Sequence, residues 1–132
     1  MGLNADNVLV RISDPAIALS FWHRVVPRKI LASHVDQGWV QMVAAGDAWP
    51  VSAAKELSAA ISGEVIWAQV YEATGDASWV RFLDGNEVHS THSDAFPDPA
   101  AAVATALKSF GVPFRMRLFQ EVLSSTSQRS HQ

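Results

Sequence analysis

The stretch that decides the fold is EVIWAQVYE (residues 64–72), followed by ASWVRFL (77–83) and EVHSTHS (87–93). Each run has the length of a β-strand, and the first two are rich in β-branched and aromatic residues. Short polar segments containing Gly75 and Gly85 separate the runs. The three runs therefore predict a β-meander, in which consecutive strands pair antiparallel.

Helix signals flank the meander on both sides. Before it, residues 52–62 place Leu57 and Ile61 four positions apart and end at Gly63, as an amphipathic helix would. After it, Asp98-Pro99 has the order of an N-cap followed by a first-turn proline. The helix that starts there should end at a glycine near a proline. One face of this helix is expected to carry Val103, Leu107 and Phe110. The helix is expected to stop at Gly111, before Pro113.

The N-terminal part of the chain predicts further elements of both kinds. Residues 7–12 favour a strand, and residues 30–44 favour a strand or hairpin that turns at 36–38. Asp14-Pro15 is a second helix-opening pair. The helix is expected to end before Pro27 and to bury one face, formed by Ile17, Phe21 and Val25. A final edge strand is expected over 114–118.

Length and composition point to one domain. The chain has 132 residues, 48% of them hydrophobic and 17% charged, and it contains no cysteine. It is long enough to form a core without disulfides, and disulfide scaffolds and thiolate sites are excluded. We predict a single α+β domain over residues 7–123, with a mainly antiparallel sheet, a central β-meander and about three helices. Residues 1–6 and 124–132 are expected to be flexible.

Because successive side chains of a strand point to opposite faces, the sequence also predicts the register in which the strands of the meander pair. Pairing Ile66, Ala68 and Val70 with Val80 and Phe82 would place all five on one core face. This register sets Val70 opposite Val80, with a three-residue loop 74–76, and Phe82 opposite Val88, with a three-residue loop 84–86.

The opposite face of the meander would then be aromatic and polar, which is the composition of a protein-binding hot spot. Alternatively, a helix covers this face and its rings belong to the core. Under the first interpretation, truncating Phe82 should destabilise the fold, and truncating Trp79 should mainly weaken a complex. The expected partner-binding residues are Trp67, Gln69, Tyr71, Glu72, Trp79, Arg81, Glu87 and His89.

Catalytic and metal motifs are sparse. The sequence contains no nucleophile elbow, Walker loop, dinucleotide fingerprint or HExxH pattern. The nearest candidate is His89 and His92 with Asp94, but residues three apart on one strand point to opposite faces. We therefore expect no catalytic residue, no metal and no cofactor. The alternative is a small-ligand binder or hydrolase-like enzyme that uses this His89/His92/Asp94 cluster.

Charge is distributed unevenly along the chain, whose net charge is −3. Residues 64–98 contain seven acids and one base, a net charge of 1 − 7 = −6, whereas residues 11–29 carry 4 − 1 = +3. No basic stripe suited to nucleic acid is present. The acidic middle would suit a basic protein partner, or it forms only a solvated face. With no spanning segment and no secretory signal, we expect a cytoplasmic protein with no membrane partner.

Residues 55–65 (KELSAAISGEV), together with 79–82, Asp84-Gly85 and Val88, resemble a group of small bacterial proteins in which a helix leads into a β-meander. Short, cysteine-free, acidic α+β chains of this kind also resemble immunity proteins (antitoxins) encoded beside polymorphic or type VI secretion toxins. The resemblance covers about half of the chain. It implies a protein without catalytic activity that binds and neutralises one cognate toxin. The chain would act as a monomer or homodimer, and a homodimeric adaptor subunit remains a further alternative.

Overall fold

The computed structural model describes residues 4–12, 14–25, 32–45, 51–71, 75–93 and 96–113. Helices and strands alternate irregularly along the chain. Their bounds are β1 Asn4–Arg11, α1 Pro15–Val25, β2 Ala32–Asp36, β3 Trp39–Ala45, α2 Val51–Ile61, β4 Glu64–Tyr71, β5 Asp76–Leu83, β6 Asn86–Ser93 and α3 Pro99–Ser109. The expected edge strand 114–118 lies outside the described residues.

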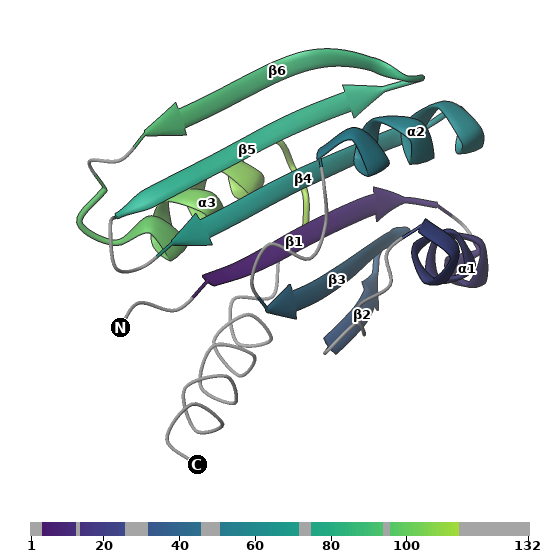
Figure 1. The fold of residues 1–132 in the computed structure, drawn as a ribbon, viewed down its shortest axis with the longest axis horizontal. Coiled ribbons are helices and arrows are strands. Elements are labelled where there is room, and N and C mark those ends of the chain that lie inside the picture. The colour runs from purple at the N-terminus through teal and green to yellow at the C-terminus, as the bar shows by residue number, and fades with distance from the viewer. Residues whose placement is uncertain are drawn as a thin grey trace.

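The six strands form one sheet in the order β2-β3-β1-β4-β5-β6 (Figure 1). Every neighbouring pair is antiparallel. β1 joins the hairpin β2–β3 to the meander β4-β5-β6 and starts at Asn4, three residues before the start that the sequence suggests. The α+β class with an antiparallel sheet is thus confirmed, and the meander occupies one end of the sheet.

Helices cover both faces of this sheet. In Figure 1, α2 lies in front of the sheet and α3 lies behind it. On the α2 side, Leu57 and Ala18 of α1 belong to one buried cluster with strand residues such as Val8 and Phe82. On the α3 side, Leu107 belongs to a second buried cluster with strand residues such as Ile66. The central strands β1 and β4 therefore have two buried faces, and each needs apolar side chains at successive positions.

Aspartates start α1 and α3 as the sequence predicts. Asp14 Oδ1 accepts a hydrogen bond from the Ala16 amide at 3.1 Å, and Asp98 Oδ1 accepts one from the Ala101 amide at 3.2 Å. Each carboxylate thereby satisfies an amide that has no partner within its helix. At the other end of α3, Gly111 adopts φ +75°, and the Val112 amide donates back to the Leu107 carbonyl. This arrangement is the Schellman motif.

The exposed face of α1 differs from the expected one. Ala18 is buried and Phe21 is half-buried, but Ile17 is 52% exposed. The helix therefore presents the Ala18–Phe21 face to the core, and the expectation that Ile17 is buried was wrong. The side chain of Val25 lies outside the described residues.

Two hairpin turns use left-handed backbone at both central positions. Gln37 and Gly38 connect β2 to β3 with φ values of 50° and 83°, and Asp84 and Gly85 connect β5 to β6 with φ values of 52° and 82°. Such turns match the twist of the strands that they join. At the second turn, the Gly85 amide donates to Ser58 Oγ of α2 at 3.0 Å. This contact ties the β5–β6 turn to α2.

The register of β4 and β5 differs from the expected one. Val70 pairs with Ala77 rather than with Val80, so the partner lies three residues earlier in the chain. A shift by an odd number turns the whole of β5 over relative to β4. The expectation failed because both faces of the sheet are buried, so apolar residues occur at odd and even positions of β4 alike.

The turn between β5 and β6 is also tighter than expected. Phe82 pairs with Glu87 rather than with Val88, and the loop has two residues, Asp84 and Gly85, rather than three. The register shifts between Arg81 and Phe82, which leaves Val88 as an extra residue in β6. Val88 is 52% exposed. On the far side of this bulge, Arg81 pairs with His89.

Candidate functional site

The structure divides the expected partner-binding face between the two sides of the sheet. Trp67 pairs with Val80 and belongs to the cluster on the α2 side, whereas Trp79 pairs with Ala68 and belongs to the cluster on the α3 side. Both indoles are 8% exposed. The proposed shared, exposed aromatic face was therefore wrong. Helices do cover both rings, but α2 covers one face and α3 the other, whereas the competing interpretation had a single helix over one shared face.

The other expected residues follow the same division. Gln69 and Tyr71 are half-buried and share the side of Trp67, because residues two apart on a strand face the same way. Arg81 and His89 pair across β5 and β6 and share the side of Trp79. Glu87 is exposed near the β5–β6 turn. Glu72 lies outside the described residues.

The α3 side contains an open groove of about 680 Å³ between α3 and the strands β5 and β6. Its strand wall comes from Trp79 of β5 with His89 and Thr91 of β6. Its helix wall comes from residues 96–98, α3 and Phe110. We call this feature the α3–β6 groove. Its size is that of a typical ligand or peptide site.

Small side chains on α3 create the space in this groove. Ala101, Ala102, Thr105 and Ala106 line it, and none has more than three side-chain heavy atoms beyond the backbone. On the opposite side of the helix, Val103 and Leu107 pack into the core. The helix is therefore anchored by its large residues, while its small residues leave a hollow beside β6.

Aromatic contacts close the two ends of the groove. Near the start of α3, the rings of Trp79 and Phe96 have centroids 5.9 Å apart. Near the end of α3, the rings of His89 and Phe110 meet edge to face, with centroids 5.4 Å apart. Thr91 Oγ1 lies 3.1 Å from His89 Nε2, so the imidazole is held by two contacts. The groove is thus formed before any partner binds.

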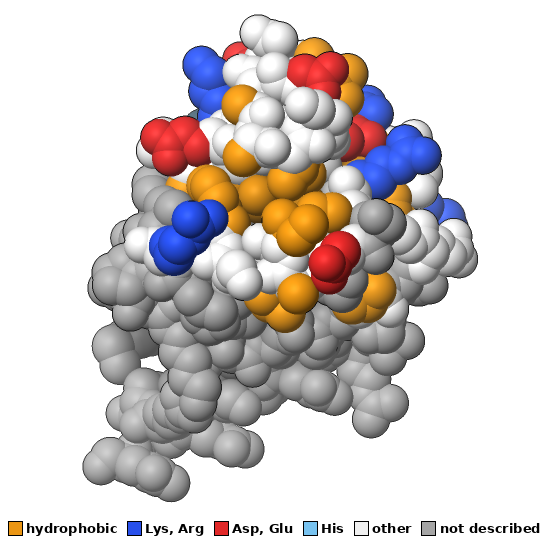
Figure 2. Space-filling view, turned by 90° about the vertical axis from the view of Figure 1, so that its right-hand side faces the viewer, with side chains coloured by type: hydrophobic (Ala, Val, Ile, Leu, Met, Phe, Trp, Pro, Cys, Tyr) orange, Lys and Arg blue, Asp and Glu red, His pale blue; other side chains and the backbone are white. Residues whose placement is uncertain are grey.

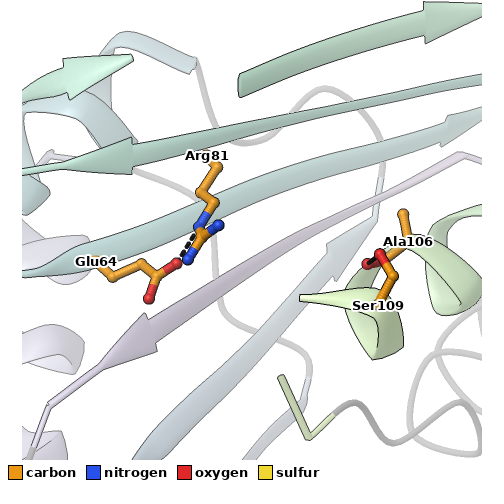
Figure 3. Close-up of polar contacts among 4 residues, drawn as sticks. All are labelled: Glu64, Arg81, Ala106 and Ser109. Atoms are coloured by element: carbon orange, nitrogen blue, oxygen red, sulfur yellow. Dashed lines mark hydrogen bonds and ion pairs between the residues drawn. The ribbon is translucent and has the colours of Figure 1, made fainter. Parts of the chain in front are cut away.

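An ion pair lies next to the Phe110 end of the groove. Arg81 of β5 donates from Nε to a carboxylate oxygen of Glu64 of β4 (Figure 3). The Glu64 side chain is 8% exposed and the Arg81 side chain is 35% exposed. The Arg81 guanidinium also lies over the Phe110 ring, 5.2 Å from its centroid. Glu64 therefore compensates the charge of Arg81, and Arg81 fixes the end of α3 on the sheet.

Figure 3 also shows the last turn of α3, where Ser109 Oγ donates to the Ala106 carbonyl at 2.6 Å. Both residues line the groove. The same Ala106 carbonyl accepts a hydrogen bond from the Phe110 amide at 3.2 Å, so the hydroxyl is a second donor to it at the end of the helix. It also keeps the Ser109 side chain against its own helix and out of the hollow.

The two candidate histidines do not share a site. His89 faces the α3 side, whereas His92 pairs with Ser78 and its Nδ1 is hydrogen-bonded to Ser78 Oγ on the opposite side. β6 extends to Ser93, so both histidines lie in regular strand and point to opposite faces. Asp94 lies outside the described residues. Among the residues that the structure describes, no three histidine or acidic side chains are placed to hold a metal ion.

A second, smaller depression of about 390 Å³ lies beside the end of β1. Ile12, Ile17 and Ile61 line it, together with Arg11. Figure 2 shows apolar side chains gathered on this side of the molecule, with charged side chains around them. The depression has less apolar wall than the α3–β6 groove and no aromatic side chain among its lining residues.

Sequence reasoning missed most of the groove. It assigned Phe96 and the alanines of α3 no role, and it placed Phe110 only on the buried face of a helix. The available signal was the run of small residues after Asp98-Pro99, because a helix with a small-residue face cannot fill the space beside a sheet.

The fold and the groove define this chain as a three-layer α+β protein with a pre-formed apolar groove on one side of its sheet. No family model, no curated protein and no solved structure matches the chain. Of the described helices, none is long and apolar enough to cross a membrane.

Proposed function

We propose that the protein is a non-catalytic binding protein that holds part of a partner protein in the α3–β6 groove. The observation that carries this proposal is the groove itself, which is apolar, open along one side and held in shape by aromatic contacts at both ends. Interface cores are rich in aromatic residues, and the residues that contribute most of the binding energy lie in well-packed pockets. A groove formed in advance also lowers the entropic cost of binding.

Charge around the groove favours a basic partner. Asp98 lines the groove, and Asp84 is exposed in the β5–β6 turn. The nearest described cation in the meander, Arg81, is already paired with Glu64. A partner with lysine or arginine beside its apolar contact residues would be attracted to this side of the molecule, and its association would slow as salt increases.

We further propose that the partner is a toxin and that the chain is its immunity protein. Support comes from the resemblance of the helix-to-meander segment, from the acidic middle of the sequence and from a groove suited to a polypeptide. In this role, the protein binds the toxin tightly and blocks its active site. The compartment proposed for this complex is the cytoplasm.

Co-expression tests this function directly. The product of the reading frame beside the gene for this chain is expressed alone and together with the chain, and cell growth and co-purification are measured. We expect the neighbouring product to arrest growth alone, and the chain to restore growth and to co-purify with it. A neighbouring product that is toxic but is neither bound nor neutralised would contradict the proposal.

A further inference from the structure

β6 is a free edge of the sheet. In the described part of the chain it pairs only with β5, and its residues from Asn86 to Ser90 are exposed. An edge strand presents unpaired amide and carbonyl groups along its outer side, which can pair with another chain. The bulge at Val88 interrupts this edge near the turn. Regular backbone for pairing therefore extends from His89 to Ser93.

The free edge and the α3–β6 groove lie side by side. His89 and Thr91 belong to both, because their backbones form the edge and their side chains form one wall of the groove. We infer that a segment of the partner protein adds to the sheet as a strand beside β6 and places alternate side chains in the groove. This inference rests on the proposed function and specifies how the partner is held.

The lengths of α3 and of the regular part of β6 agree with the addition of a partner strand beside β6. Five residues from His89 to Ser93 span roughly 16 Å as a strand, and the 11 residues of α3 span roughly 16 Å as a helix. A partner strand would therefore pair over about five residues. Because side chains alternate, two or three of them would face the groove.

The lining of the groove specifies the chemistry of those side chains. Ala102 and Thr105 leave room above α3, and Trp79 and Phe96 offer ring faces at one end. Aliphatic or aromatic side chains fit this space. Since Asp98 lines the groove together with Phe96, a basic residue is expected at the corresponding end of the segment.

The experiment uses defined peptides as probes of the full chain. Fluorescein-labelled heptapeptides alternate lysine with leucine, phenylalanine, tyrosine or tryptophan, and binding is measured by fluorescence anisotropy. A matched peptide carries N-methyl groups on alternate backbone amides, which removes strand pairing and keeps every side chain. A second matched peptide replaces lysine with glutamate. We expect N-methylation and charge reversal each to weaken binding by about tenfold or more.

Protein variants locate the binding site. Thr105→Trp fills the groove from an exposed position of α3, and Ala104→Trp adds the same side chain to α3 at a position outside the groove lining. Circular dichroism melting confirms that both variants fold. We expect Thr105→Trp to weaken peptide binding by about tenfold or more and Ala104→Trp to change it by less than about twofold.

Several results would overturn the inference. Strand addition would be wrong if no peptide of alternating lysine and apolar residues binds, or if the N-methylated peptide binds as tightly as the unmodified one. It would also be wrong if Thr105→Trp and Ala104→Trp weaken peptide binding equally. A dimer that dissociates in Thr105→Trp would show that a second copy occupies the groove. Neutralisation of the toxin that is insensitive to Thr105→Trp would overturn strand addition and the α3–β6 groove as the binding site, and would leave the immunity role intact. Peptide binding without neutralisation would reject the immunity role and keep the groove as a peptide site.

Discussion

Trp67 and Trp79 lie on neighbouring strands of the sheet with their indoles on opposite faces. Trp67 packs in the cluster beneath α2, and Trp79 packs in the cluster beneath α3. Each ring is 8% exposed, so each fills a core that the other does not reach. The stability of the domain therefore depends on two separate apolar layers that share the same strands.

Truncation of either tryptophan should destabilise the protein. Trp67→Ala and Trp79→Ala are each expected to lower the free energy of unfolding by about 3–5 kcal/mol, because each leaves a cavity in its own cluster. Urea denaturation followed by circular dichroism measures both values. The milder changes Trp67→Phe and Trp79→Phe, alone and combined, should be additive within about 0.5 kcal/mol, since the rings share no cluster. An unchanged free energy for Trp79→Ala would contradict the burial of its ring.

The β5–β6 turn should be more sensitive to a methyl group than the β2–β3 turn. Gly38 and Gly85 both adopt left-handed backbone, so alanine at either should cost about 1–2 kcal/mol from backbone strain. A Cβ on Gly38 would meet no atom within 4 Å, but a Cβ on Gly85 would lie 2.9 Å from Ala59 Cβ. Gly85→Ala should therefore cost about 1–3 kcal/mol more than Gly38→Ala. Thermal and urea unfolding of both variants provide the comparison.

The same contact can be checked by rescue. In an Ala59→Gly background, Gly85→Ala should lower the free energy of unfolding by about as much as Gly38→Ala does. The reason is that the Ala59 methyl group, which the new Cβ at position 85 would clash with, has been removed. Equal costs at the two glycines in the native background would show that the β5–β6 turn does not press against α2.

The ion pair between Glu64 and Arg81 should show strong coupling. Arg81→Leu leaves the buried Glu64 carboxylate without its charged partner and is expected to cost about 1–3 kcal/mol, a value reduced by the partial exposure of Arg81. Replacing both residues by leucine should cost less than the sum of the two single changes. A double-mutant cycle measured by urea denaturation should give a coupling energy of about 1 kcal/mol or more. Additive single changes would mean that the pair contributes nothing to stability.

The cap of α3 supports the helix wall of the groove. Asp98→Ala removes the acceptor for the Ala101 amide and should lower the free energy of unfolding by about 1 kcal/mol. Asp98→Asn keeps an oxygen acceptor and should retain most of the stability. Equal losses for alanine and asparagine would indicate that the negative charge, rather than the hydrogen bond, stabilises the helix start.

The sequence placed the ends of the helices well because those ends are local. Asp14 and Asp98 accept hydrogen bonds from amides two and three residues away, and Gly111 provides the left-handed residue that ends α3. None of these contacts depends on another part of the chain. The existence of the meander was also predictable, since each run of strand-forming residues is bounded by its own turn.

The register and the groove depended on tertiary structure. On β4, both Ile66 and Trp67 are buried because helices cover both faces, so alternation alone could not decide which side chains of β5 join them. The groove arises where the small residues of α3 meet β6, and this meeting is set by the packing of Val103 and Leu107 on the sheet. The sequence by itself determined the elements, because propensities and caps act over a few residues. Their register and the hollow between them were decided only by long-range packing, which a local pattern does not encode.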